Sequence, residues 1–464
     1  MKKSLVALAV LAASGAYAQS SVTLFGIVEA TTDIGYKRTQ DTTTTINTFN
    51  AAGAGLTSVV NSSTAQQKNG MRIQDGSDQG TGSSRVGFRG TEDLGGGLKA
   101  NFLLEMGLRI DDGCTTLGSA ANCDNGGNSA NSGGSTFGRN AWGGLSGGFG
   151  EVRLGRQVLG SFGVQGNSGN SGASNGLYDS TTAGLSTIGG VRFSNAIRYL
   201  SPNLGGFTGS LMFAAPETGS AIVNGGFGPT SATTTAGGFT SNNNTSRRTG
   251  VDLALEYANG PAYIGFGYNK RDAGNNTSSV IPNALGSTSV AGVPGTVTAY
   301  TLGGAYDLGV VKPFINYTRQ RSDQSGSTTF TSVNPALSTF NTATGDATQK
   351  ALSIGLRAPV GAFTVIAGYG RVTTTNNSVL AGTVAGITNT VAGRGEDKRD
   401  AFQLGAQYAL SKRTLVEANY GYNKLRSNGS AVGSSTLAGT GRVETFTNFN
   451  DRISGLNVGL KHSF

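Results

Sequence analysis

The chain is poor in residue types that are frequent in soluble enzymes. Of its 464 residues only 13% are charged, one is histidine and 9 are proline, whereas 75 are glycine. A soluble globular protein usually carries about 25% charged residues. No H-E-x-x-H, G-x-S-x-G or phosphate-binding loop pattern occurs, and the one histidine, His462, lies near the chain end. We therefore expect no enzymatic activity, no catalytic residue, no metal site and no cofactor.

Long apolar runs are missing as well. After Gln19 no stretch approaches the roughly 20 apolar residues that a transmembrane helix needs. At the N-terminus two lysines precede a short apolar segment from Leu5 to Ala13, and Ala16-Tyr17-Ala18 forms an A-x-A cleavage site. These features are typical of a secretory signal peptide. We expect residues 1–18 to be removed and residues 19–464 to form one exported domain.

Cysteine is nearly absent. Cys114 and Cys123 lie in a segment rich in glycine, asparagine and serine. In an exported protein such a pair favours a disulfide that closes one loop. Two cysteines with neither a neighbouring histidine nor a second pair make a poor zinc site.

Apolar and polar residues alternate along many segments. Between Ala401 and Leu410 the even-numbered positions are apolar or aromatic, whereas Gln403, Gly405 and Gln407 stand between them. The segments 251–258 and 350–357 show the same pattern. A period of two predicts β-strands, because a helix would place apolar residues at i, i+3, i+4 and i+7. The segments are about 8–14 residues long, close to the 9–11 that a tilted strand needs to cross a bilayer.

The connections between these segments alternate in length. Short turns are expected at Leu94–Gly97, Gly147–Gly150, Pro202–Gly205, Asn259–Pro261, Asp307–Val310, Pro359–Gly361 and Ser411–Arg413. Long polar loops are expected at 37–80, 111–136, 160–190, 217–247, 273–296, 322–348, 374–398 and 427–450.

Seven turns and eight loops join sixteen strands, with both termini on the side of the turns. In a bilayer every backbone polar group must be paired, which only a closed sheet achieves with strands. We predict an all-β fold, a 16-stranded antiparallel transmembrane β-barrel. Sixteen strands leave an aqueous channel, whereas about eight would be filled by side chains.

The chain is basic, with a formal net charge of +9. Its lysines and arginines are scattered and do not form the runs of five to eight that bind nucleic acid, so we expect no nucleic-acid partner. Two interpretations remain. The charge belongs either to a mildly basic solvated surface or to a positive lining of a water-filled lumen.

A series of short motifs resembles the trimeric general porins of β-proteobacteria over the whole mature chain. These motifs are Ser21–Gly26, Ser84–Gly95, Leu98–Ala100, Gly148–Gly150, Arg153–Gln157, Arg192–Tyr199 and Gly459–Phe464. The resemblance implies a homotrimer of the Gram-negative outer membrane that lets small hydrophilic solutes and ions diffuse passively. It also implies a constricting third loop, here Gly160–Gly190, and a preference for anions.

The resemblance assigns five residues to the pore constriction. They are Arg85, Arg139 and Arg198 on the wall, Glu105 opposite them, and Asp179 in the third loop. The alternation agrees with an inward direction for most of the charges, since Arg on the lipid face would cost about 2–4 kcal/mol at mid-bilayer. It also turns Arg89, Arg153, Arg192 and Arg357 inward, and Arg139 too if Trp142 faces lipid.

Rings of arginine or lysine favour anions in a pore. The alternative is that several of these arginines pair with acids and contribute no selectivity. A substrate-specific outer-membrane channel for sugars or phosphorylated anions would share most of these features. A purely structural barrel is disfavoured because sixteen strands enclose a wide lumen with no evident plug domain.

The C-terminal strand carries an assembly signal by resemblance. Leu456, Val458, Leu460 and His462 share one face and end in the terminal aromatic Phe464. Such a terminus resembles the signal recognised by the outer-membrane barrel assembly machinery. The other expected partners are outer-membrane lipid and small ions.

Reduction of the expected Cys114–Cys123 disulfide should leave the channel open, because the pair lies in the second extracellular loop. Single-channel conductance with and without reductant measures this. A large conductance change on reduction would contradict the placement of the pair.

Overall fold

The computed structural model describes most of the mature chain. The described residues are 21–49, 55–75, 84–110, 113, 136–169, 191–215, 222–223, 242–243, 249–272, 279–283, 286–332, 339–384, 387–427, 430–437 and 441–464. The expected signal peptide, Cys114, Cys123 and Asp179 lie outside them, so these expectations stay predictions. No helix among the described residues is both long and apolar enough to cross a membrane.

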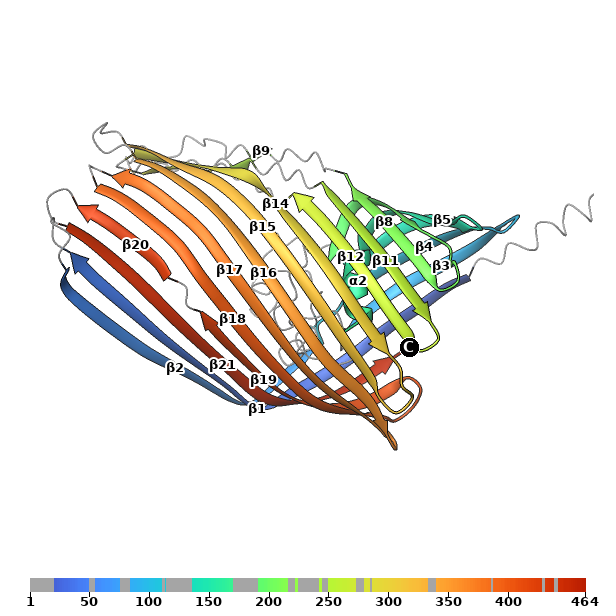
Figure 1. The fold of residues 1–464 in the computed structure, drawn as a ribbon. Coiled ribbons are helices and arrows are strands. Elements are labelled where there is room, and N and C mark those ends of the chain that lie inside the picture. Colours follow the sequence, from blue (N-terminus) through green and yellow to red (C-terminus); the bar gives the residue numbers. More distant parts are fainter. Residues whose placement is uncertain are drawn as a thin grey trace, which may run out of the picture.

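The described chain forms a closed antiparallel β-barrel of sixteen wall strands (Figure 1). The first strand, β1 (Ser21–Phe49), pairs through its N-terminal part with β3 (Arg85–Gly95) and through the rest with β2 (Gly55–Asp75), so β2 and β3 act as one wall strand. The others are β4 (Leu98–Gly107), β5 (Asn140–Gly147), β6 (Gly150–Val158), β7 (Arg192–Leu200), β8 (Phe207–Ala214), β11 (Gly250–Asn259), β12 (Ala262–Asp272), β14 (Gly286–Tyr306), β15 (Lys312–Ser332), β16 (Thr339–Val360), β17 (Phe363–Val384), β18 (Ile387–Ala409), β19 (Thr414–Ser427) and β21 (Gly441–Ser463).

The ring closes where the last strand meets the first. β21 pairs with β1 over a long register that begins at Ile27 opposite Ser463. Four short strands lie outside the wall: β9 (Ile222–Val223) pairs with β10 (Asn242–Asn243), β13 (Ser279–Asn283) with β14, and β20 (Ser430–Leu437) with β18 and β21. The predicted fold class is therefore confirmed.

The strands are longer on one side of the barrel than the sequence indicated. β14 to β18 each have 21 to 23 residues. The expected loops 37–80, 273–296, 322–348, 374–398 and 427–450 are largely strand, so the predicted strand length was wrong there. These extensions are rich in threonine and serine, and their sequences do not alternate, so β propensity alone indicates strands there.

The short turns fall at the expected ends of the strands. Gly309 and Gly361 adopt positive φ angles of 80° and 63° in two of them, which a side-chain-bearing residue rarely does. The Gly309 amide donates to a carboxylate oxygen of Asp307 at 2.8 Å. This bond fixes the turn between β14 and β15.

Apolar side chains cover the outward face, and polar side chains line the inward face. Leu302 on β14 is 55% exposed, whereas its neighbour Thr301 is 1% exposed. On β18, Leu404 points outward and Gln403 is buried inside. The alternation predicted for Ala401–Leu410 is therefore confirmed, and β14 shows the same distribution, which lipid outside and water inside require.

The outward apolar band ends at aromatic residues. Tyr268 and Tyr300 face each other on β12 and β14 with ring centroids 5.2 Å apart. On β17 the next outward residue beyond Tyr369 is Arg371, which pairs with Asp400 at 2.7 Å. Aromatic rings followed by charges mark the interface between lipid and water.

Replacing Leu302 with arginine should lower the free energy of unfolding by about 2–4 kcal/mol, since a cation near the bilayer midplane is costly. The matched substitution Thr375→Arg, on the outward face of β17 beyond Arg371, should cost only about 0–1 kcal/mol. Urea unfolding in lipid vesicles measures both. Equal losses at the two positions would contradict the assigned band.

Candidate functional site

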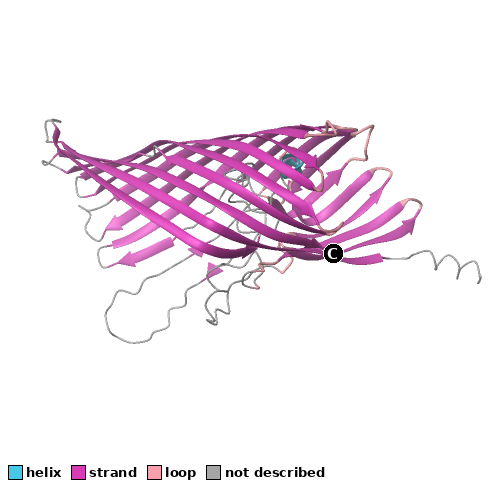
Figure 2. Cartoon of the chain, turned by 90° about the horizontal axis from the view of Figure 1, so that it is seen from below, coloured by secondary structure: helices cyan, strands magenta, loops and turns pink. Residues whose placement is uncertain are grey.

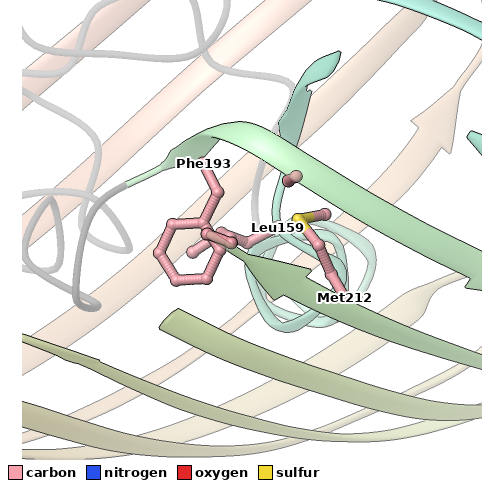
Figure 3. Close-up of a cluster of buried hydrophobic side chains, with 5 residues drawn as sticks. Leu159, Phe193 and Met212 are labelled. Atoms are coloured by element: carbon pink, nitrogen blue, oxygen red, sulfur yellow. The ribbon is translucent and has the colours of Figure 1, made fainter. Parts of the chain in front are cut away.

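A short helix lies inside the barrel (Figure 2). This helix, α2 (Gly160–Asn167), follows β6 and occupies the start of the expected third loop. Leu159, just before it, is 1% exposed and packs with Phe193 of β7 and Met212 of β8 (Figure 3). This apolar cluster fixes the entry of the loop to the inward face of the wall.

Hydrogen bonds hold both ends of α2 to the barrel. At its start, Asp252 of β11 accepts from the amides of Gly160 at 2.7 Å and Ser161 at 3.3 Å, and from the Ser161 hydroxyl. A carboxylate at this end also complements the helix dipole. At the other end, Asn316 of β15 donates to the Ser168 hydroxyl at 2.7 Å.

Glycines in the wall let the helix approach closely. A Cβ atom on Gly267 of β12 would lie 2.7 Å from the Cα of Ser161, and one on Gly303 of β14 would collide with the Ser168 side chain. Larger residues at these positions would push α2 away from the wall. The helix position is therefore specified by wall residues far from it in sequence.

Three of the predicted constriction residues meet on the inward face. Glu105 of β4 accepts from Arg139 at 2.6 Å and from the Asn140 amide at 2.7 Å, and Arg85 Nε lies 3.6 Å from the same carboxylate. Arg156 donates to the carbonyl of Gly138 at 2.6 Å and so fixes the segment that carries Arg139. These residues are half-buried or buried.

Arg198, the fourth, lies further along the wall. It donates to the carbonyl of Val158 at 3.0 Å and to the Ser210 hydroxyl at 3.1 Å. Its cross-strand neighbour is Arg153, which pairs with Glu151 at 2.6 Å. Two arginines directly opposite each other repel, and an anion bound between them would reduce this repulsion.

Trp142 faces the lumen, contrary to the orientation considered for it from the sequence. It lies opposite Leu103 on β4 and Gly155 on β6, which share the inward face with Glu105 and Arg153. The Arg153 guanidinium stands 4.1 Å from the centre of its ring. Arg139 turns inward all the same, because the segment before β5 brings it to Glu105.

A cavity of about 720 Å³ opens beside these residues. Five arginines and two glutamates line it, a formal surplus of three positive charges. The arginines are Arg85, Arg89, Arg139, Arg153 and Arg192, and the glutamates are Glu105 and Glu151. Both glutamates pair with arginines, so the interpretation that some arginines are neutralised holds for part of the cluster.

Other arginines form no direct ion pair, although Asp252 and Glu256 act electrostatically on Arg198 and Glu105 acts on Arg192. Among the described residues no ion pair is recorded for Arg89, Arg192 or Arg198. Elsewhere on the inward face, Arg357 donates to Gln407 at 2.9 Å, and Gln407 donates to Glu417 at 3.0 Å. The inward direction expected for each of these arginines agrees with the structure.

The sequence did not reveal Asp252, Phe162 or Trp142 as site residues. Asp252 reads as one polar residue in an alternating strand, and nothing local links it to a helix 91 residues away in the chain. Phe162 lies in a segment predicted as loop. In the part of the chain that the structure describes, no group of three potential metal ligands occurs.

The sequence matches the family described as Gram-negative porin over residues 4–428. It is 29% identical to outer membrane porin protein 32 of Delftia acidovorans, with 100% of both chains covered. It is 30% identical to an outer membrane porin protein of Bordetella pertussis, covering 91% of this chain and 94% of the relative.

Solved structures with a similar fold include a loop L8 deletion mutant of OmpT, an outer membrane protein of Vibrio cholerae. It covers 96% of this chain and 99% of its own, with 14% identity and a TM-score of 0.50. An anion-selective porin from Comamonas acidovorans covers 96% of this chain and 100% of its own, with 23% identity and a TM-score of 0.47.

The substitution Asp252→Ala should loosen α2, since it removes the bonds at the helix start. Each hydrogen bond to a charged group contributes about 1.5–3 kcal/mol. We expect larger solutes to permeate faster in liposome swelling assays, with a smaller effect for Asp252→Asn, which keeps one acceptor oxygen. Unchanged swelling rates for Asp252→Ala would contradict a positioning role for this carboxylate.

Proposed function

Because the chain belongs to the Gram-negative porin family, we propose that it is a general diffusion channel whose arginine-lined cavity prefers anions. It is an outer-membrane β-barrel through which small hydrophilic solutes and ions pass by passive flow. A water-filled lumen of sixteen strands suits this activity. The proposal assigns it no enzymatic role.

The charge of the cavity is the observation that best supports the anion preference. Its lining has a surplus of three positive charges. A monovalent anion about 8 Å from a guanidinium in water gains about 0.5 kcal/mol before screening, and a cation loses as much. The Debye length at physiological salt is about 8 Å, so only arginines close to the ion path act on it.

Pairing divides the arginines into two roles. Arg139 and Arg153 are held by Glu105 and Glu151 and keep the wall and its side chains in place. Arg89, Arg192 and Arg198 supply the positive potential. Arg85 adds to it, because its guanidinium lies 3.6 Å from Glu105 and is paired more loosely than Arg139. The constriction then comprises Arg85, Arg139, Arg198 and Glu105, with Asp179 contributed by the third loop.

We also propose how the protein is exported and assembled. Residues 1–18 serve as a signal peptide, and three mature chains assemble as a homotrimer. Phe464 is recognised by the barrel assembly machinery. In support, its ring lies outward over Gly26 of β1, where the two backbones exchange hydrogen bonds of 3.1 Å. Cys114 and Cys123 form a disulfide in the second extracellular loop.

The test is the reversal potential of the purified protein in a planar bilayer under a potassium chloride gradient. The sign should correspond to chloride preference. The double variant Arg85→Gln/Arg198→Gln should lower the chloride-to-potassium permeability ratio about fourfold at physiological salt. Screening there reduces the chloride-to-potassium difference of about 1 kcal/mol per removed charge to about 0.4 kcal/mol, or about twofold.

A matched control is Arg371→Gln, which removes an arginine from the outward face. It should leave the permeability ratio unchanged. An unchanged ratio in the double variant would refute the roles of Arg85 and Arg198, and cation preference of the native protein would overturn the proposed selectivity.

A further inference from the structure

Apolar and aromatic side chains form part of the lining of the arginine-lined cavity. Phe25 of β1, Leu103 of β4, Trp142 of β5 and Phe162 of α2 all line it. A channel for hydrated ions needs no such surface, because a hydrated ion gains nothing from contact with an apolar ring. Apolar walls with a few convergent polar groups are typical of ligand sites, and the volume lies within their usual range of about 300–1,000 Å³.

Two of the aromatic rings each lie beside a guanidinium group. Arg153 stands over the Trp142 ring at 4.1 Å, and Arg89 lies 5.4 Å from the centre of the Phe25 ring. A ring held beneath a cation has a fixed orientation. The two pairs therefore present flat apolar surfaces beside positive charge.

Hydrogen-bond donors in the cavity are in excess. The Nε atoms of Arg153 and Arg192 are buried and have no hydrogen-bond partner among the described residues. The two carboxylates, Glu105 and Glu151, already accept from arginine and asparagine side chains. The cavity therefore offers unused N–H groups to an acceptor.

We propose that this cavity is a binding site for small aromatic carboxylates, which rests on the anion preference proposed above. The carboxylate accepts from the arginines near Arg192, and the flat ring lies against Trp142 and Phe25. A sugar fits less well, since it carries no negative charge to pair with the surplus arginines. Chloride and acetate satisfy the arginines and leave the aromatic side without a contact.

The test compares benzoate with acetate as blockers of the chloride current through single channels. Benzoate should block in a saturable way with an apparent affinity about tenfold higher than acetate, since an aromatic contact is worth up to about 1.5 kcal/mol. Trp142→Leu should bring the benzoate affinity close to that of acetate. Trp142→Phe should retain most of it.

The matched control is Tyr420→Leu, which removes an aromatic residue from the outward face of β19. It should leave the benzoate block unchanged. Equal block by benzoate and acetate in the native channel would overturn the proposal, as would unaltered block in Trp142→Leu.

Reversal potentials of the same channels separate the two proposals. A native channel that prefers chloride but blocks equally with benzoate and acetate retains its anion preference and loses only the aromatic site. A channel with no anion preference loses the proposed selectivity itself.

Fluorescence of the native protein gives a second readout that needs no variant. Trp142 is the only tryptophan in the chain, so all tryptophan emission reports on the cavity. Benzoate should quench it with saturation, whereas acetate should not. Linear, unsaturated quenching by benzoate would contradict a bound state.

Discussion

Closure of the backbone hydrogen-bond ring is the constraint on which the rest of the structure depends. Each wall strand pairs its N–H and C=O groups with two neighbouring strands. The last strand, β21, closes the ring by pairing with β1 from Ile27 onward. Without that last pairing two strand edges would face lipid, where each unpaired polar group costs several kcal/mol. Once the ring is closed, the period of two separates a lipid face from a water face. Charged side chains can then be placed inside without facing hydrocarbon.

The helix inside the barrel shows how the wall specifies the lumen. Asp252 binds the start of α2, while Gly267 and Gly303 leave the space into which it packs. Because these residues come from strands β11, β12 and β14, the loop position depends on the pairing of these strands. Carboxylates order the arginines of the cavity as well, Glu105 of β4 for Arg139 and Glu151 for Arg153 of the same strand. The proposed selectivity therefore depends on strand register, which sets the side chains that face one another.

The sequence predicted the architecture because the alternation and the turns are local signals. Ile354 and Leu404 faced outward as expected, and Arg85, Glu105 and Arg198 faced inward. It underestimated the strands beyond the bilayer, where threonine-rich hairpins have no apolar face to alternate. It also could not place Trp142, because the glycines of its strand leave no difference in polarity between the two faces. Nor could it link Asp252 to α2. These features depend on pairing between segments distant in sequence, which periodicity does not encode.

The central claim is that alternate residues near the arginines face water at positive potential. The direct measurement is the rate at which charged thiol reagents modify a single cysteine, placed at Asn101 or at Leu104 in a protein whose two native cysteines are replaced by serine. Asn101 lines the cavity, and Leu104 lies opposite the exposed Phe88 in the outward set. The account predicts that the cysteine at 101 reacts faster with an anionic than with a cationic reagent, and that the cysteine at 104 is protected in bilayers. Faster reaction with the cationic reagent at 101, or equal reactivity at 104, would contradict it.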